Sequence, residues 1–181
     1  DVVTWQPKLH KKTNYMYIGL VDGNLRAQYY EGTDEAGNKI RQPVNKKMID
    51  DTMCCMGPCF YMWKDRFWEL EGCDENHGGW GQQGVEVALK AMSSGGRLVV
   101  NKNTWFAHWF RGGGVPEGHK KGFPYRMTNH AVNIARAYSN DLWMNNKWGG
   151  QKIPFRQVLE RFWPVPCWSA EKLLELQRRE F

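Results

Sequence analysis

The sequence predicts an α/β domain, in which short strands alternate with helices. Three observations predict this class. Short extended runs bounded by turn residues fill the first part of the chain, and amphipathic helical patterns follow from Gln83 onward. Hydrophobic residues make up 41% of the 181 residues, which is enough for a core and excludes an intrinsically disordered chain.

The N-terminal part predicts several strands. Val2–Leu9 is β-branched at its start and contains Pro7, so we expect a strand at an edge or an end of a sheet. Tyr15–Leu20 and Leu25–Tyr30 are two further extended runs, and the sequence Asp-Gly-Asn between them is a turn signal. The polar segment Glu31–Lys47 contains two glycines and a proline and predicts a loop.

The middle of the chain predicts one strand, one short helix and a loop. Cys59–Trp63 is apolar and aromatic, which is typical of a buried strand. Lys64–Leu70 predicts a short helix with its apolar residues, Phe67 and Leu70, three positions apart on one face. Asp74–Gly81 has three glycines and no apolar period, so we expect a loop.

A helix is predicted over Gln83–Met92. Its apolar residues recur at helical spacing, at Val85, Leu89 and Met92. Gly95 and Gly96 follow it and predict its end. Strands are expected next, over Arg97–Asn101 and Thr104–Trp109.

The C-terminal part is predicted to be helical. Arg111–Tyr125 is rich in glycine and proline and predicts a loop. Asn129–Trp148 predicts a long helix, and Pro154–Phe162 and Ser169–Arg179 predict two more. Ser169 is suited to cap the last of these helices.

The charge balance limits the possible partners. Lys plus Arg number 25 and Asp plus Glu number 19, which gives a formal net charge of +6. This excess permits an anionic ligand. Interleaved basic and aromatic residues also suit a single-strand nucleic-acid binder, but no RNP-type or OB pattern is present and the charges are scattered, so we expect no nucleic-acid partner. No run of apolar residues approaches the length of a membrane-spanning helix.

The five cysteines are irregularly spaced, which is a poor framework for disulfides. Cys54, Cys55 and Cys59 lie close enough in sequence to suggest a metal site, but no paired cysteine spacing recurs elsewhere. We therefore expect reduced thiols packed as small hydrophobic side chains, and a cytoplasmic location.

The most informative stretch runs from Thr52 to Arg111. It places a polar, glycine-rich loop at the start of a helix and a lone histidine at the end of a strand. Loops at such ends are where α/β proteins bind ligands. Its motifs, in order, are Gly57-Pro58, Lys64-Asp65-Arg66-Phe67, Cys73-Asp74, Trp80-Gly81-Gln82-Gln83-Gly84, Gly95-Gly96 and His108-Trp109-Phe110-Arg111.

This ordered set resembles the second half of a GT-A fold glycosyltransferase of the family 2 type, in particular the polypeptide N-acetylgalactosaminyltransferases. The likeness continues into the C-terminal part. Leu142-Trp143-Met144 resembles the family's Val-Trp-Met in the helix after its lid, and the segment around Pro164, Cys167 and Trp168 is similar to its Lys-Pro-Phe-x-Trp.

The resemblance implies a partial GT-A fold, with a small mixed sheet, flanking helices and a C-terminal helical extension. Residues 1–128 would form the acceptor-side half, including a glycine-rich lid over residues 111–126, and residues 129–181 would form the extension packed on it. The family's nucleotide-binding half, with its Asp-x-Asp or Asp-x-His metal motif, would precede Asp1.

The resemblance also implies a chemistry. His108 would be a ligand of the catalytic Mn²⁺ (or Mg²⁺), at a site that is incomplete without the other half. Arg111 would face the donor diphosphate, and His119 and Tyr125 of the lid would contact donor or acceptor. Trp80 and Gly81 match the family's acceptor-side and donor-sugar motif. From the residues alone, a buried histidine and a core tryptophan are alternatives for His108 and Trp80.

One departure concerns the catalytic base. Gln83 stands where the family has Glu, and Gly84 stands where inverting relatives have an Asp base. Glutamine can hydrogen-bond a hydroxyl but cannot abstract its proton. The candidate catalytic residues are therefore Gln83 with Asp74 and Glu86 as acidic substitutes, although Glu86 also suits a role in capping or solvating its helix. Glu75 and His77 lie nearby.

We therefore expect a fragment of a metal-dependent glycosyltransferase, of the hexosyl- or N-acetylhexosaminyltransferase type. Its donor would be a nucleotide sugar, with a UDP-sugar as the first choice, and its acceptor a hydroxyl of a glycan, peptide or lipid-linked molecule. The alternative is a stand-alone carbohydrate-binding module that uses exposed tryptophans without catalysis.

Overall fold

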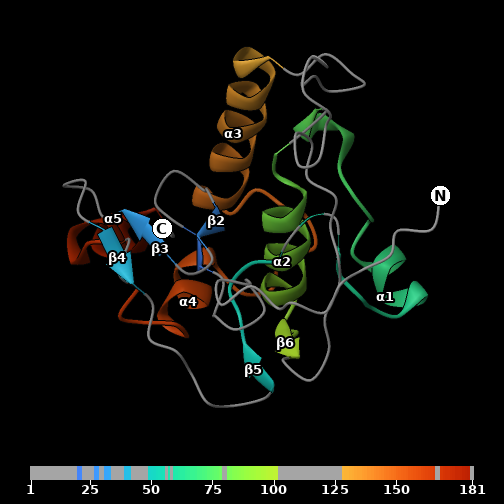
Figure 1. Cartoon of the computed structure of the whole chain (residues 1–181), viewed down its shortest axis with the longest axis horizontal. Coiled ribbons are helices and arrows are strands. Elements are labelled where there is room, and N and C mark those ends of the chain that lie inside the picture. Colours follow the sequence, from blue (N-terminus) through green and yellow to red (C-terminus); the bar gives the residue numbers. More distant parts are fainter. Residues whose placement is uncertain are drawn as a thin grey trace, which may run out of the picture.

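The computed structural model describes residues 20–21, 27–28, 31–33, 39–41, 49–55, 57, 59–78, 81–101, 128–165 and 168–179. Its helices surround a central helix, α2 (Gln83–Ser93), with α3 (Asn129–Met144) and α4 (Phe155–Glu160) beside it and α1 (Lys64–Glu69) at one end of the molecule (Figure 1). Helix α5 (Ala170–Arg178) packs on α4. Mixed helix and short strands are consistent with the predicted α/β class.

The described strands form three antiparallel pairs, each of two strands. These are β1 (Leu20–Val21) with β2 (Ala27–Gln28), β3 (Glu31–Thr33) with β4 (Lys39–Arg41), and β5 (Ile49–Asp51) with β6 (Val99–Asn101). The expected mixed sheet, which needs a parallel pair, is absent from the residues described. The GT-A fold stays a prediction.

The strand predictions have three outcomes. β2 and β6 confirm strands within the runs Leu25–Tyr30 and Arg97–Asn101, although each strand is shorter than its run, whereas β1 shares only Leu20 with the predicted run Tyr15–Leu20. The predicted loop over Glu31–Lys47 is wrong, because it contains the β3–β4 pair. The sequence of this pair is mostly polar and carries no apolar alternation from which the strands could be predicted. The predicted buried strand over Cys59–Trp63 is wrong, because this segment forms no strand and Cys59, Tyr61 and Trp63 are exposed. Val2–Leu9 and Thr104–Trp109 lie outside the described residues.

The middle helices begin and end close to their predicted positions. The inner side of helix α1 carries half-buried Phe67, and buried Leu70 follows directly after the helix. The predicted loop that follows contains one 3-10 turn, η2 (Glu75–His77). Helix α2 ends as predicted, since Gly95 takes the left-handed φ of 96° and Gly96 donates to the carbonyl of Ala91 at 3.0 Å.

The C-terminal helices confirm the predicted elements and sharpen their ends. Thr128 caps α3, and Ser169 caps α5 as expected, with Oγ accepting from Lys172 N at 3.2 Å. Helix α3 stops before the predicted Trp148, because Asn146 is left-handed with φ 52° and Lys147 N turns back to Leu142 O at 2.8 Å.

The core lies around α2, which is buried on every side beyond its first residue. Trp143, Phe155 and Leu159 are fully buried beside it. Trp143 and Trp148 meet edge to face at 6.0 Å, and so do Phe155 and Trp168 at 5.7 Å. Several of the ten tryptophans therefore serve the core.

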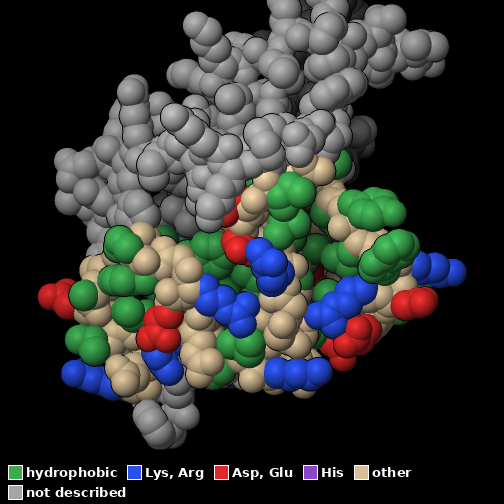
Figure 2. All heavy atoms as spheres, turned by 90° about the horizontal axis from the view of Figure 1, so that it is seen from below, with side chains coloured by type: hydrophobic (Ala, Val, Ile, Leu, Met, Phe, Trp, Pro, Cys, Tyr) green, Lys and Arg blue, Asp and Glu red, His purple; other side chains and the backbone are tan. Residues whose placement is uncertain are grey.

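On the face seen in Figure 2, the acidic and basic side chains of the described residues are interspersed and do not form a patch of one charge. None of the helices that the structure describes is long and apolar enough to cross a membrane.

Candidate functional site

The candidate site is built on the turn between α1 and α2, which we call the 71–78 turn. It starts with two consecutive left-handed residues, Glu71 with φ 61° and Gly72 with φ 58°. A Cβ at Gly72 would lie 3.1 Å from the Phe67 ring, which is a tight contact, and the positive φ also favours glycine there. The Glu71 carboxylate accepts from Trp148 Nε1 at 2.9 Å, which fixes the turn to the segment after α3.

Several hydrogen bonds hold the Asp74 carboxylate in this turn. It caps η2, with Oδ1 accepting from Asn76 N at 2.9 Å and from Asn76 Nδ2 at 2.7 Å. Its second oxygen, Oδ2, accepts from the Tyr138 hydroxyl of α3 at 2.6 Å. The carboxylate is half-buried. These bonds hold it in one orientation.

The charge states of this pair follow from the same bonds. Partial burial acts to raise the pKa of Asp74, but the hydrogen bonds from Tyr138 and Asn76 outweigh it, so the pKa is lowered. The bond to Asp74, with some burial, raises the pKa of Tyr138 to about 12. At neutral pH, Asp74 is thus an anion and Tyr138 a neutral donor.

Glu86 lies under the turn, and its side chain is only 2% exposed. Its Oε1 accepts from Asp74 N at 2.6 Å and from Lys90 Nζ at 2.9 Å. Lys90, equally buried, also donates to Gly72 O at 3.1 Å. A buried ion pair therefore ties both ends of the segment Gly72–Asp74 to α2.

His77 completes the buried side of the turn. Its ring meets the Tyr138 ring edge to face at 4.9 Å, and its Nδ1 lies 3.5 Å from Glu86 Oε2. Among the described residues, neither ring nitrogen has a hydrogen-bond partner. The contact with Glu86 is therefore looser than those made by Asp74 and Lys90.

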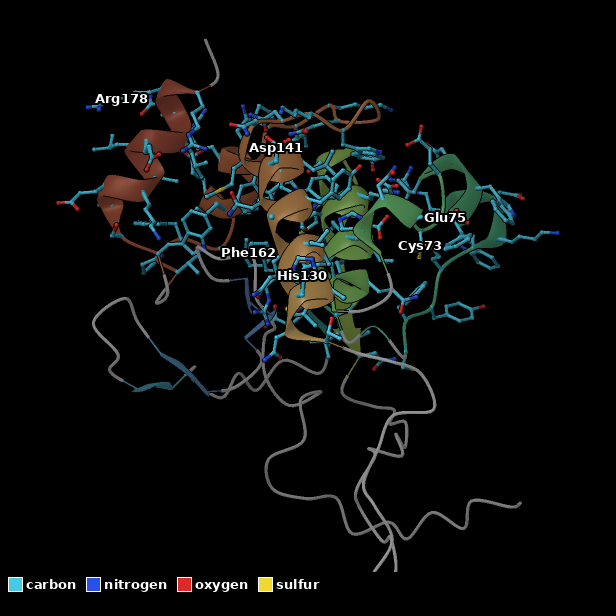
Figure 3. The ribbon with its side chains drawn as sticks, turned by 90° about the horizontal axis from the view of Figure 1, so that it is seen from above. Cys73, Glu75, His130, Asp141, Phe162 and Arg178 are labelled. Carbon is cyan, nitrogen blue, oxygen red and sulfur yellow. The ribbon has the colours of Figure 1, made fainter. Side chains whose placement is uncertain are left out.

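Gln83 is exposed at the first position of α2. Its Nε2 lies 3.8 Å from Cys73 Sγ, which places it beside the residue that precedes Asp74. Gly81 is also exposed and takes a left-handed φ of 110°. Figure 3 shows Cys73 and Glu75 in the turn next to α2, with α3 and His130 on the neighbouring side.

The N-terminus of α2 is pressed against the segment that precedes α1. A Cβ at Gly84 would lie 2.0 Å from Cys55 O, so no other residue fits without moving the backbone. The Cys55 thiol donates to Gly84 O at 3.4 Å, and burial raises its pKa to about 12. This contact fixes the start of α2, where Gln83 lies.

The structure brings together three of the predicted site residues, Asp74, Gln83 and Glu86, with Gly81 close to them in sequence. The others lie outside the described residues: Trp80, His108, Arg111, His119 and Tyr125. Within the described ranges, no group of three or more His, Cys, Asp or Glu side chains is arranged to hold a metal ion. The proposed metal role of His108 is therefore untested.

Two members of the site are not predicted by the sequence analysis. Lys90 follows Glu86 by four positions, and this spacing is the known signal of an ion pair on a helix. Tyr138 reaches Asp74 across 64 positions of sequence, and no local pattern indicates such a contact.

Comparisons with known proteins give one partial match. The chain is 32% identical over 87 residues to N-acetylgalactosaminyltransferase 4 of Drosophila melanogaster. This stretch is 48% of the chain but only 14% of the fly protein. No family model matches the chain. No solved structure matches it either. The chain therefore resembles part of a glycosyltransferase over about half of its own length.

Proposed function

We propose that the chain carries the acceptor side of a glycosyltransferase. The partial match to the fly enzyme supports glycosyl transfer in general. The observation that carries the proposal within the fold is that the 71–78 turn presents Asp74 close to Gln83 at the start of α2, while the buried Glu86–Lys90 pair holds the turn on α2. Motif order from Cys73-Asp74 to Trp80-Gly81 adds to this support.

The proposed reaction breaks the bond between the anomeric carbon of a UDP-sugar and its diphosphate, and forms a bond to an acceptor hydroxyl oxygen. The diphosphate leaves with the bonding electron pair, and the hydroxyl proton passes to a base or to solvent. Arg111 would stabilise the leaving diphosphate, while His119 and Tyr125 would close over it. The sugar would be a hexose or an N-acetylhexosamine.

Asp74 and Gln83 are proposed to orient the acceptor. An ionised carboxylate can accept a hydrogen bond from the hydroxyl, and Tyr138 keeps Asp74 ionised and aimed. Because its pKa is lowered, Asp74 is better suited to orienting a hydroxyl than to removing its proton. Glu86 is proposed to act through the turn as a positioning residue, since its carboxylate is buried and already bonded.

A divalent cation is part of the proposal through His108, which lies outside the described residues. When bound, Mn²⁺ or Mg²⁺ would neutralise charge on the diphosphate. The described residues supply no ligand cluster of their own, so any further ligands must come from elsewhere in the protein.

The test is a transfer assay on the complete gene product, with a panel of UDP-sugars and glycan, peptide and lipid-linked acceptors, read by mass spectrometry. Transfer should require Mn²⁺ or Mg²⁺ and should be abolished by a chelator. The variant His108→Ala should lose most of this activity, while His130→Ala, at an exposed position on α3, should keep it. Absence of transfer with every donor would contradict the proposal.

A carbohydrate-binding module remains the second candidate, because Trp63 and Trp68 are 77% and 64% exposed. This candidate predicts binding to a glycan array that a chelator does not change. The transferase proposal predicts metal-dependent turnover instead, so one array and one assay separate the two.

A further inference from the structure

A pocket lies at the C-terminal end of α2, whereas the candidate site lies at its N-terminal end. In Figure 1 this is the end of α2 beside β6. The pocket has a volume of about 420 Å³, and small-molecule pockets have volumes of roughly 300–1,000 Å³. Its lining comes from the end of β5, the segment that joins α2 to β6, and the end of α4. It shares no residue with the 71–78 turn.

The interior of the pocket is apolar. Met92 is 1% exposed, and Leu98 and Phe162 are half-buried where they pack against the core. Gly95 and Gly96 line the pocket without side chains, which leaves room beside these three residues. An apolar ring or chain placed there would leave water and gain free energy in proportion to the area it buries. The body of a suitable ligand is therefore apolar.

Three charged side chains complete the lining. Arg97 is already paired, because its Nε and Nη2 donate to the two carboxylate oxygens of Asp51 at 2.9 and 3.0 Å. Among the residues that the structure describes, Arg161 makes one hydrogen bond, from Nη1 to Gly96 O at 3.3 Å, and no ion pair. A guanidinium carries five N–H donors, so Arg161 has donors left for a ligand.

These charges select the polar group of the ligand. Asp51 and Arg97 neutralise each other, so one net positive charge remains in the lining, at Arg161. A carboxylate matches a guanidinium through two parallel hydrogen bonds. Asp51 would repel a phosphate dianion more strongly than a single carboxylate, and Arg161 would repel a cation. A group with one negative charge and a planar pair of oxygens fits best.

We propose that this pocket binds a small monocarboxylate with an apolar or aromatic body. Its carboxylate would pair with Arg161, and its body would lie against Met92, Leu98 and Phe162. The proposal does not depend on the proposed function, because none of these residues belongs to the candidate site.

Fluorine NMR of the complete gene product with para-fluorophenylacetate tests the proposal. We expect saturable binding with a Kd on the order of millimolar, as for other ligands of this size. The neutral para-fluorophenylacetamide and the dianionic para-fluorophenyl phosphate should each bind about tenfold more weakly or worse. Absence of saturable binding would overturn the proposal. Equal binding of the amide, or tighter binding of the phosphate, would overturn it as well.

A matched pair of arginine variants locates the binding. Arg161→Gln should weaken the binding of para-fluorophenylacetate about tenfold or more, because the charged pair is lost. Arg178→Gln is the control and should bind as the unaltered protein does, since Arg178 is exposed on α5, well apart from Phe162 in Figure 3. Equal affinity of the two variants would show that the carboxylate binds elsewhere, and the proposal would fail.

A third variant separates the charge of Arg161 from its shape. Arg161→Lys keeps the positive charge but loses the planar fork, so it should recover only part of the affinity that Arg161→Gln loses. Melting curves without the probe verify that each variant is folded. A folded lysine variant that binds no better than the glutamine variant would contradict a charge-based site.

Discussion

Asp74 and Tyr138 are the residues at which the candidate site depends most on tertiary structure. Their hydrogen bond of 2.6 Å joins the 71–78 turn to α3. It favours the anion of Asp74 and the neutral form of Tyr138, so its contribution to stability should be fully present between the ordinary pKa values of the two groups. That contribution is lost as pH falls through the lowered pKa of Asp74, and again as pH rises toward about 12.

Replacement of Tyr138 with Phe should show this linkage. At pH 7, Tyr138→Phe should lower the free energy of unfolding by about 1–2 kcal/mol, after a discount for the partial exposure of the pair. The loss should shrink in acid, where Asp74 is protonated. Urea titrations at both pH values measure it. The variants Asp74→Asn and Tyr138→Phe should be non-additive when combined, and strict additivity would rule out the coupling.

The Glu86–Lys90 pair should behave as a buried ion pair. Glu86→Leu leaves the Lys90 ammonium without its carboxylate, which should cost about 3–5 kcal/mol of unfolding free energy. The double variant Glu86→Leu with Lys90→Met removes both charges and should be clearly more stable than the single one. Urea unfolding of the two proteins decides this; a double variant no better than Glu86→Leu would contradict the assignment.

At the scale of elements, the site depends on the close contact between α2 and the segment before α1. Gly84 makes this contact possible, because a Cβ there would lie 2.0 Å from Cys55 O. The sequence shows Gly84 only as a departure from an acidic family position. The structure gives it a packing role.

Gly84→Ala should therefore be severely destabilising, by roughly 3 kcal/mol or more, since backbone rather than a flexible side chain must move. Gly149→Ala is the matched control, because a Cβ at Gly149 meets nothing within 4 Å. Thermal melts of both variants give the comparison. A mild effect at Gly84, similar to that at Gly149, would show that the α2 contact is looser than described.

Local patterns explain why the helices were predictable. The period of Val85, Leu89 and Met92 and the glycines after them define α2 without reference to the rest of the chain. The cap at Ser169 is equally local. The β3–β4 pair was missed, because its polar residues carry no alternating signal.

At the scale of the whole molecule, the contacts that build the site join distant segments. Trp148 binds Glu71 and Tyr138 binds Asp74, across 77 and 64 positions, and sequence periodicity does not encode such pairs. The sequence predicted Glu86 as a catalytic candidate, whereas its burial and partners suit a positioning role. Among the described tryptophans, Trp143, Trp148 and Trp168 are buried in the core, whereas Trp63 and Trp68 are exposed at and just before α1.

The most direct test of the central claim compares acceptor-side variants of the complete gene product. Transfer to acceptor and hydrolysis of the UDP-sugar are measured in parallel for Asp74→Asn and Gln83→Ala, with melting curves to verify folding. An acceptor-side role predicts that both variants lose transfer, through a raised acceptor KM or a lower kcat, while they retain donor hydrolysis. Unchanged transfer, or loss of hydrolysis and transfer together in folded protein, would contradict it.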